Sequence, residues 1–306
     1  MHPHGPASVP VAYRRWRDQV RPLILFGVTL VAILALAVHG PIPQAADYHS
    51  FADQRPWLGL PNFSNTLSNL GFLLVGAAGL WALRRGVPAG GLALLRPAYL
   101  VFFDSTALLF PTSGIYHLWP SNATLAWDRL AMAIAFMAFF AAVIGEYIDS
   151  RLGARLLVPL VLIGIVSVAY WRLTDTGDGG DLRPYLLVQF LPMLLIPFIA
   201  VSYPPSLRPP WYLWALLASY GLAKLLELLD DPILRLSQGL SGHTLKHIVA
   251  AIGIAFFLLG LYLRRSVSTG HHPPPPMRKS NQSASSKGQR TAAATTSATT
   301  MESATE

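Results

Sequence analysis

Cysteine is absent from the 306-residue chain, and charged residues make up only 12% of it. Without thiols the chain can form no disulfide, no thiolate metal site and no cysteine nucleophile, so any metal ligand must come from histidine or carboxylate side chains. A soluble domain carries about 25% charged residues, because water must solvate its surface. Since apolar residues make up 53% of this chain, we expect most of its surface to face lipid.

Apolar runs of membrane-spanning length are abundant instead. A helix needs roughly 20 apolar residues to cross a bilayer. Eight runs approach or exceed that length: 23–38, 67–83, 98–116, 125–147, 156–171, 185–203, 211–229 and 243–263. Prolines 111, 192 and 197 interrupt some of them, which membrane helices tolerate when neighbouring groups satisfy the backbone. The sequence therefore predicts an all-α polytopic membrane protein without an internal repeat.

Both ends of the chain differ in character from the apolar runs. Residues 1–22 are basic, and with the run that follows (23–40) they resemble a signal peptide, but a retained anchor helix fits better because small residues come only well past the run. Residues 266–306 contain His271, His272, four successive prolines and a Ser/Thr/Ala-rich end. Nothing there could bury a core, so we expect a disordered tail, in which the histidine pair could bind a metal only weakly.

Arginines predict the orientation of the chain in the membrane. Twelve arginines lie in the amino terminus and alternate loops, and four lie in the other loops. The first group comprises Arg14, Arg15, Arg17, Arg21, Arg84, Arg85, Arg96, Arg151, Arg155, Arg208, Arg264 and Arg265, and the second Arg55, Arg172, Arg183 and Arg235. By the positive-inside rule both termini belong in the cytoplasm. The same rule explains the net charge of +8 without nucleic-acid binding.

Five residues with catalytic potential lie at the ends of apolar runs. Ser113 and His117 are four residues apart, and so are His243 and His247, which puts each pair on one face of a helix. Asp128 follows His117 after a short loop. The spacing suits two imidazoles on one metal ion. The predicted topology brings all five to the outer membrane face. Ionisable groups at membrane depth are costly, so their gathering on one face favours a functional site.

These residues resemble a known family pattern. The order Ser113, His117, Asp128, His243 and His247 is similar to the S-x-x-x-H, D, H-x-x-x-H signature of the alkaline ceramidase family, within a superfamily of seven-helix hydrolases that includes adiponectin-type receptors. The segment 62–69 resembles that family's E-F-W-N-T-x-S-N motif. The resemblance covers about residues 47–263. It implies a seven-helix hydrolase core (41–265) preceded by one extra transmembrane helix (23–40).

The resemblance implies a mechanism and a substrate. A Zn²⁺ ion would be held by His117, His243 and His247, with Asp128 orienting or deprotonating a water molecule and Ser113 donating to the oxyanion. The substrate would be ceramide, phytoceramide or a related N-acyl lipid, cleaved into a fatty acid and a free amine. We expect an inner-membrane protein of bacterial type with the site facing the periplasm. The oligomeric state stays open.

Calcium is doubtful, because the sequence departs from the family there. The corresponding region offers only Asp47, Asp53 and Asn62, and calcium prefers several carboxylate oxygens. Asn65, Ser68 and Asn69 are expected to cap the second helix and bind across helices. The acidic loop of Asp175, Asp178 and Asp181 lacks the EF-hand glutamate and is expected to be solvated.

Three other functions compete with an amide hydrolase. The same zinc site could cleave a lipid ester, or a structural zinc could support a receptor-like lipid-binding protein. A transporter would use the polar residues within the spans, Asp104, Lys224 and Glu227. We expect these three to form a structural polar network, because no repeat or pair of broken helices is present.

Overall fold

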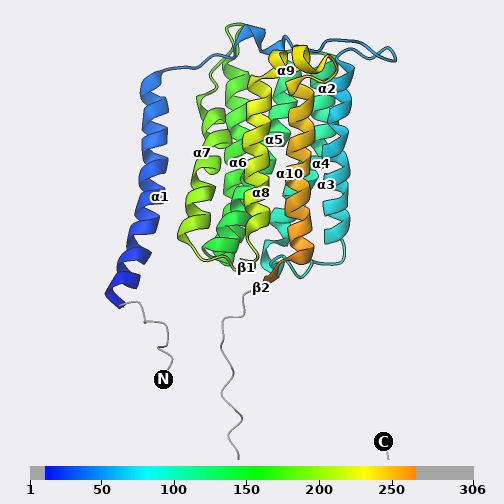
Figure 1. Ribbon diagram of the computed structural model, residues 1–306. Helices are drawn as coiled ribbons and strands as arrows, with labels where there is room; N and C mark the ends of the chain where they lie inside the picture. The colour runs from blue at the N-terminus through cyan, green and yellow to red at the C-terminus, as the bar shows by residue number, and fades with distance from the viewer. Residues whose placement is uncertain (1–10, 267–306) are drawn as a thin grey trace, which may run out of the picture. The chain divides into compact units, whose positions relative to one another are not determined.

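The computed structural model describes residues 11–266, with side chains from residue 19 onward, and within this range the chain is almost entirely helical (Figure 1). The α-helices are α1 (Val11–His39), α2 (Phe63–Ser68), α3 (Leu70–Leu83), α4 (Arg96–Leu118), α5 (Asn122–Tyr147), α6 (Ser150–Thr174), α7 (Arg183–Ser202), α8 (Trp211–Leu228), α9 (Asp230–Ser237) and α10 (Gly242–Leu263). Two 3₁₀ turns, η1 (Ala46–His49) and η2 (Ala93–Leu95), and two short strands, β1 (Leu207–Arg208) and β2 (Arg265–Ser266), complete it.

The predicted class, an all-α polytopic membrane protein, is confirmed. Seven stretches are long and apolar enough to cross a membrane, and α8 with α9 forms an eighth if this pair is one span. α9 is bent by 80° from α8. The first ten residues and the tail after residue 266, including His271 and His272, lie outside the described residues, so the predictions for them stay predictions.

Helix starts near the site are set by capping residues. Ser121 and Thr124 form a capping box at the start of α5, and the Ser241 hydroxyl accepts from the Thr244 amide at the start of α10. Such caps satisfy backbone N–H groups that have no partner within the helix. They define where α5 and α10 begin, and therefore the height at which Asp128 and His243 lie in the bundle.

Small residues allow close packing between neighbouring helices. A Cβ atom added to Gly76 on α3 would lie 2.5 Å from the Ala107 backbone nitrogen on α4. A Cβ added to Gly153 on α6 would lie 2.5 Å from the Gly145 Cα on α5. Helix association within a bilayer depends on such close contacts, because lipid chains are as apolar as the side chains. These glycines bring α3 to α4 and α5 to α6.

The helices surround α5, which is the most buried of the spans. Phe102, Phe103, Phe139 and Phe257 form an aromatic cluster at the core, with ring centroids 5.1–6.2 Å apart. α1 lies beside α7 and buries none of the residues in its apolar stretch (Figure 1). The described structure is thus a seven-helix core with one peripheral amino-terminal helix, as expected.

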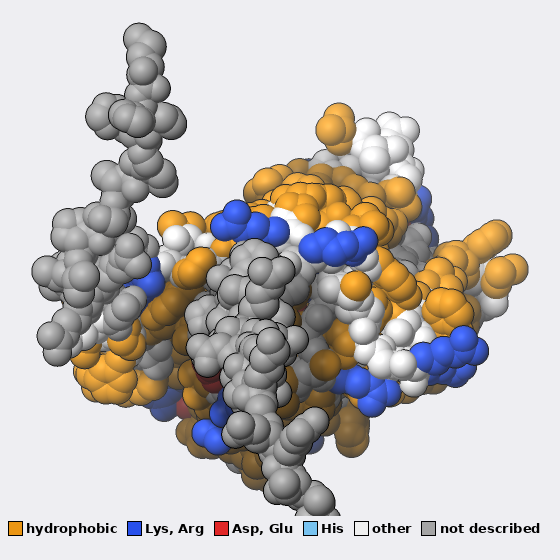
Figure 2. All heavy atoms as spheres, turned by 90° about the horizontal axis from the view of Figure 1, so that it is seen from below, with side chains coloured by type: hydrophobic (Ala, Val, Ile, Leu, Met, Phe, Trp, Pro, Cys, Tyr) orange, Lys and Arg blue, Asp and Glu red, His pale blue; other side chains and the backbone are white. Residues whose placement is uncertain are grey.

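The end of the bundle that carries β1 and β2 is the basic one. Arginine side chains gather on this face (Figure 2). Beneath them, the Arg264 guanidinium donates to both carboxylate oxygens of Glu146 at 2.6 and 2.9 Å, and the Tyr99 hydroxyl donates to the same carboxylate at 2.7 Å. All three side chains are buried, so this network joins α4, α5 and the end of α10. The candidate site lies at the opposite end.

Element boundaries differ from the sequence expectation in three places. The expected span 67–83 is two helices, α2 and α3, which meet at Asn69. Helix α1 begins at Val11, well before its apolar run. The short α9 was not predicted; it starts with Asp230, Asp231 and Pro232, which are residue types favoured in a first helical turn.

Candidate metal centre and cavity

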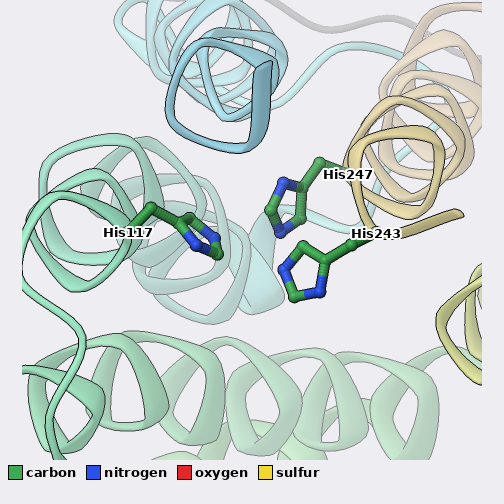
Figure 3. A group of neighbouring side chains, drawn as sticks. All are labelled: His117, His243 and His247. Atoms are coloured by element: carbon green, nitrogen blue, oxygen red, sulfur yellow. The ribbon is translucent and has the colours of Figure 1, made fainter. Parts of the chain in front are cut away.

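Three buried histidines converge at the end of the bundle opposite β1 and β2. His117 lies in the last turn of α4, whereas His243 and His247 lie in the first turns of α10. Their ring centroids are 4.9, 4.9 and 5.2 Å apart, and one nitrogen from each lies within 4.8 Å of the others. The imidazoles point toward one another from the two helices (Figure 3). The structure therefore brings together the three ligands that the sequence predicted, in a group able to hold a metal ion.

The hydrogen bonding of the histidines fits a bound metal. Both ring nitrogens of His117 and Nε2 of His243 are buried and have no hydrogen-bond partner among the described residues. Buried polar atoms are nearly always satisfied, so several orphaned nitrogens facing one point need an explanation. A metal ion bound between the rings would accept their lone pairs. Tetrahedral zinc sites commonly use three histidines, which agrees with this donor set.

A second group of polar residues holds the histidines in place. The Ser68 hydroxyl lies 2.8 Å from Nδ1 of His247, which leaves Nε2 for the metal. The Asn62 side-chain amide donates to the His117 carbonyl oxygen at 2.7 Å, and the His243 amide donates to the Asp230 carboxylate at 2.7 Å. The Ser68 contact fixes the orientation of the His247 ring, whereas the other two contacts hold the backbone of His117 and His243.

The expectation for the Asn65–Asn69 segment was right about cross-helix bonds, and capping occurs only at the end of α2. Ser68 contacts α10 through His247, and Asn65 Oδ1 accepts from the Thr244 hydroxyl at 2.8 Å. The Asn69 side chain donates to the carbonyl oxygens of Asn65 and Thr66 in the last turn of α2, at 2.8 and 3.4 Å. No side-chain cap is formed at the start of α2 or of α3.

A strap between α1 and α2 covers the histidines. The Phe51 ring lies 4.7 Å from the His117 ring and 5.0 Å from the His243 ring. After it, the Arg55 guanidinium binds both carboxylate oxygens of Asp53 at 2.8 and 2.9 Å and also donates to the Gly239 carbonyl oxygen. This pairing holds the pKa of the Asp53 carboxyl below its usual range. Asp53, which the sequence offered as a possible calcium ligand, is therefore paired with Arg55.

A cavity of about 430 Å³ opens beside the histidines. His243, His247, Ser113 and Asp128 line its outer end, and His117 lies outside the lining. Asp128 is half-buried on α5 and interacts with the Ser113 hydroxyl on α4. The rest of the lining is mostly apolar and includes Phe102, Met132, Phe136, Phe139, Met193 and Ile254. The two predicted catalytic residues and two of the ligands therefore share one amphipathic cavity.

Charged residues also line the cavity, and one of them, Lys246, was not among the residues singled out from the sequence. Glu227 on α8 binds Lys224 one turn away and Lys246 on α10, the latter at 2.5 Å. The expected polar network thus exists for Lys224 and Glu227, and Lys246 joins it. Its position in the sequence, three residues after His243 and on the same helix face, was the available signal.

Two expectations about acidic residues were wrong. Asp104 is exposed on the outer surface of α4 and, within the described residues, makes no hydrogen bond or ion pair, so it belongs to no network. The loop of Asp175, Asp178 and Asp181 is solvated only at Asp178. Asp175 accepts from Asn122 at 2.9 Å, and Asp181 is buried against Arg183, so these two carboxylates hold the outer loops together.

Comparisons with known proteins add no assignment. No protein-family model matches the sequence, and no curated protein matches it significantly. Function must therefore be argued from the geometry of the metal centre and its cavity.

Proposed function

We propose that the protein is a membrane-embedded, zinc-dependent hydrolase that cleaves the amide bond of ceramide, phytoceramide or a related N-acyl lipid. The observation that carries the proposal is one cavity lined by two of the three candidate ligand histidines, His243 and His247, together with a carboxylate, a hydroxyl and a largely apolar remainder. The resemblance of the same five residues to the alkaline ceramidase pattern supports the choice of an amide bond.

The shape and composition of the cavity support an acyl-lipid substrate. Its volume lies within the range of about 300–1,000 Å³ that small-molecule sites occupy. Phe190 of α7 and Lys224 of α8 both line it and are partly exposed on the outer surface of the bundle. Because α7 packs on α1, α5 and α6 while α8 packs on α9 and α10, the seam between α7 and α8 offers a path from the bilayer.

Each polar residue of the cavity has a chemical role in this proposal. Bound zinc supplies Lewis-acid activation of water and of the acyl carbonyl. Asp128 accepts the proton of the attacking water and delivers it to the leaving amine. Ser113 donates a hydrogen bond to the carbonyl oxygen as negative charge develops on it. Phe51 and the strap exclude bulk water from the outer side of the histidines.

Hydrolysis and metal content measured together test the proposal. Purified wild-type protein should hold about one zinc ion and release fatty acid from an N-acyl lipid. Asp128→Asn should keep the metal and lose activity by about 10²–10⁴-fold, and Ser113→Ala by about 10²–10³-fold. His243→Ala should lose both. Asp104→Asn is the matched control, because this carboxylate lies outside the cavity, and should be fully active.

Two outcomes would contradict the proposal. Zinc-loaded wild-type protein that releases no fatty acid from any ceramide, phytoceramide or other N-acyl lipid is not an amidase, and the same assay on ester lipids then tests the ester alternative. Hydrolysis by Asp128→Asn at the wild-type rate would remove Asp128 from the mechanism even if the protein is an enzyme.

A further inference from the structure

Arg129 is a buried cation without a carboxylate partner. Its side chain is 5% exposed on α5, directly after Asp128, and it lines the cavity. Among the residues that the structure describes it forms no ion pair, and its Nη1 atom is buried without a hydrogen-bond partner. Its one hydrogen bond is from Nη2 to the Gln44 side-chain oxygen. The neighbouring Asp128 carboxylate interacts with this charge electrostatically but forms no hydrogen bond with it. A buried N–H group without an acceptor is costly, so a bound anion that accepts from Nη1 would remove that cost.

Aromatic rings surround the guanidinium without satisfying it. The Arg129 Cζ atom lies 4.3 Å from the Trp171 ring centroid, 4.8 Å from that of Tyr185 and 5.4 Å from that of Tyr48. Cation–π contacts of this kind stabilise the charge and hold the guanidinium in one orientation. The Nη1 hydrogens nevertheless lack an acceptor. The cage therefore preorganises a donor that is still free to bind.

A second unpartnered donor lies in the same place. The Tyr185 hydroxyl is buried, lines the cavity and has no hydrogen-bond partner in the described part of the chain. A guanidinium N–H and a phenol O–H side by side suit an oxyanion, which accepts from both. The charged side chains of the cavity are three cations, Arg129, Lys224 and Lys246, and two carboxylates, Asp128 and Glu227, so one positive charge is in excess.

We propose that Arg129 and Tyr185 form a subsite for the anionic group of an acyl lipid, and this proposal rests on the function proposed above. Consecutive residues of a helix point about 100° apart, so Asp128 faces Ser113 while Arg129 faces the cage on α6 and α7. One ligand can then reach both, with its acyl carbonyl at the metal centre and a carboxylate, phosphate or sulfonate a few bonds away. The preferred substrate class is an anionic N-acyl lipid.

Binding of an amphiphile that cannot be hydrolysed tests the subsite apart from any activity. Hexadecyl phosphate and hexadecanol share a chain and differ in charge. Calorimetric titration of the full-length protein in neutral detergent should show at least about tenfold tighter binding of hexadecyl phosphate. Arg129→Gln should abolish that preference, Arg129→Lys should keep part of it, and Arg172→Gln, an exposed arginine outside the cavity, should leave it unchanged.

Tyr185→Phe is a second variant that tests the subsite even if Arg129→Gln does not fold. It removes only a hydroxyl that has no partner, so the fold should be kept while affinity for hexadecyl phosphate falls about threefold to tenfold. Unchanged affinity in a folded Arg129→Gln protein, or equal binding of both amphiphiles by the wild type, would overturn the subsite. The subsite would also be overturned if the preference for hexadecyl phosphate disappeared after a chelator removed the metal, because that result would mean that the phosphate binds the metal and not Arg129.

Competition with inorganic phosphate distinguishes a site for an anionic lipid from a site for a free anion. Inorganic phosphate should not compete with hexadecyl phosphate at millimolar concentration, because it lacks the apolar chain. Effective competition that depends on Arg129 would overturn the lipid assignment in favour of a free anion. None of these titrations involves turnover. If the protein prefers hexadecyl phosphate as expected but hydrolyses no N-acyl lipid, the proposed function is wrong and the anion subsite stands.

Discussion

At the residue scale, the geometry of the candidate metal centre depends on side chains outside the three histidines. Ser68 is the clearest case, because its hydroxyl contacts Nδ1 of His247 at 2.8 Å and its own helix at the Asn65 carbonyl oxygen at 2.9 Å. The contact determines which nitrogen of His247 faces the other two rings. A ligand that is free to rotate binds a metal more weakly, since its orientation must be fixed on binding.

Ser68→Ala should therefore weaken zinc binding by about 10–100-fold while leaving the fold intact. Zinc affinity measured by competition with a chelator checks this, together with the thermal stability of the metal-free protein. Thr112→Ala is the control, because that hydroxyl bonds only to the Leu108 carbonyl of its own helix. Equal zinc affinity in the wild type and in Ser68→Ala would show that Ser68 does not orient His247.

At the scale of elements, a buried carboxylate contributes to the attachment of the strap to the loop between α6 and α7, beside two backbone hydrogen bonds. Asp181 accepts from the Arg183 guanidinium at 2.8 Å, from the Tyr170 hydroxyl at 3.2 Å and from the Ile42 amide at 3.3 Å. It thus joins the segment after α1 to α6 and α7. These bonds, first among them that from Arg183, lower the pKa of Asp181 to about 2.

The lowered pKa predicts a stability effect with a defined sign. Because the folded state favours the charged carboxylate, its contribution is complete above the ordinary pKa of about 3.9 and is lost as the pH falls through about 2. Asp181→Asn should lower the free energy of unfolding by about 1–3 kcal/mol at pH 7. The difference from wild type should shrink between about pH 4 and pH 2.

Thermal unfolding of both proteins in detergent across this pH range is the measurement. Asp178→Asn, in the same loop but exposed, should match wild type throughout. A stability difference for Asp181→Asn that stays constant down to pH 2 would mean that the carboxylate charge does not hold the strap.

At the scale of the whole molecule, the two ends of the bundle differ in charge and in chemistry. Arginines gather at the end with β1 and β2 (Figure 2), whereas the histidine group, the strap and the cavity lie toward the other end. The positive-inside rule predicts that the basic end faces the cytoplasm and that the site opens to the opposite face of the membrane.

Single cysteines in this cysteine-free chain test the orientation. Asp178→Cys in the outer loop should react with an impermeant maleimide in intact cells, and Arg85→Cys at the basic end should react only after lysis. Both positions are exposed and neither caps a helix, so a cysteine there should leave the fold intact. The opposite labelling pattern would place the chemistry in the cytoplasm.

Local sequence features were sufficient to predict the spans and the proximity of the five candidate site residues, whereas the catalytic roles of Ser113 and Asp128 stay predictions. Hydropathy and helical spacing are properties of adjacent residues, so they predicted the transmembrane stretches and the pairing of His243 with His247. His117, Ser113 and Asp128 followed because short loops and alternating topology leave little freedom in where span ends lie. The identity of zinc and of the amide bond stays a prediction.

The direction in which each helix faces was decided only by the tertiary structure. Asp104 was expected inside a polar network and faces outward, whereas Arg129 and Lys246 face inward into the cavity. A polar residue within a span looks the same in the sequence whether it meets lipid, a partner or a cavity, because its surroundings come from helices distant in the chain. The side chains around Arg129 come from three separate segments: Gln44 and Tyr48 from the strap, Trp171 from α6 and Tyr185 from α7. Only packing against α5 brings them together.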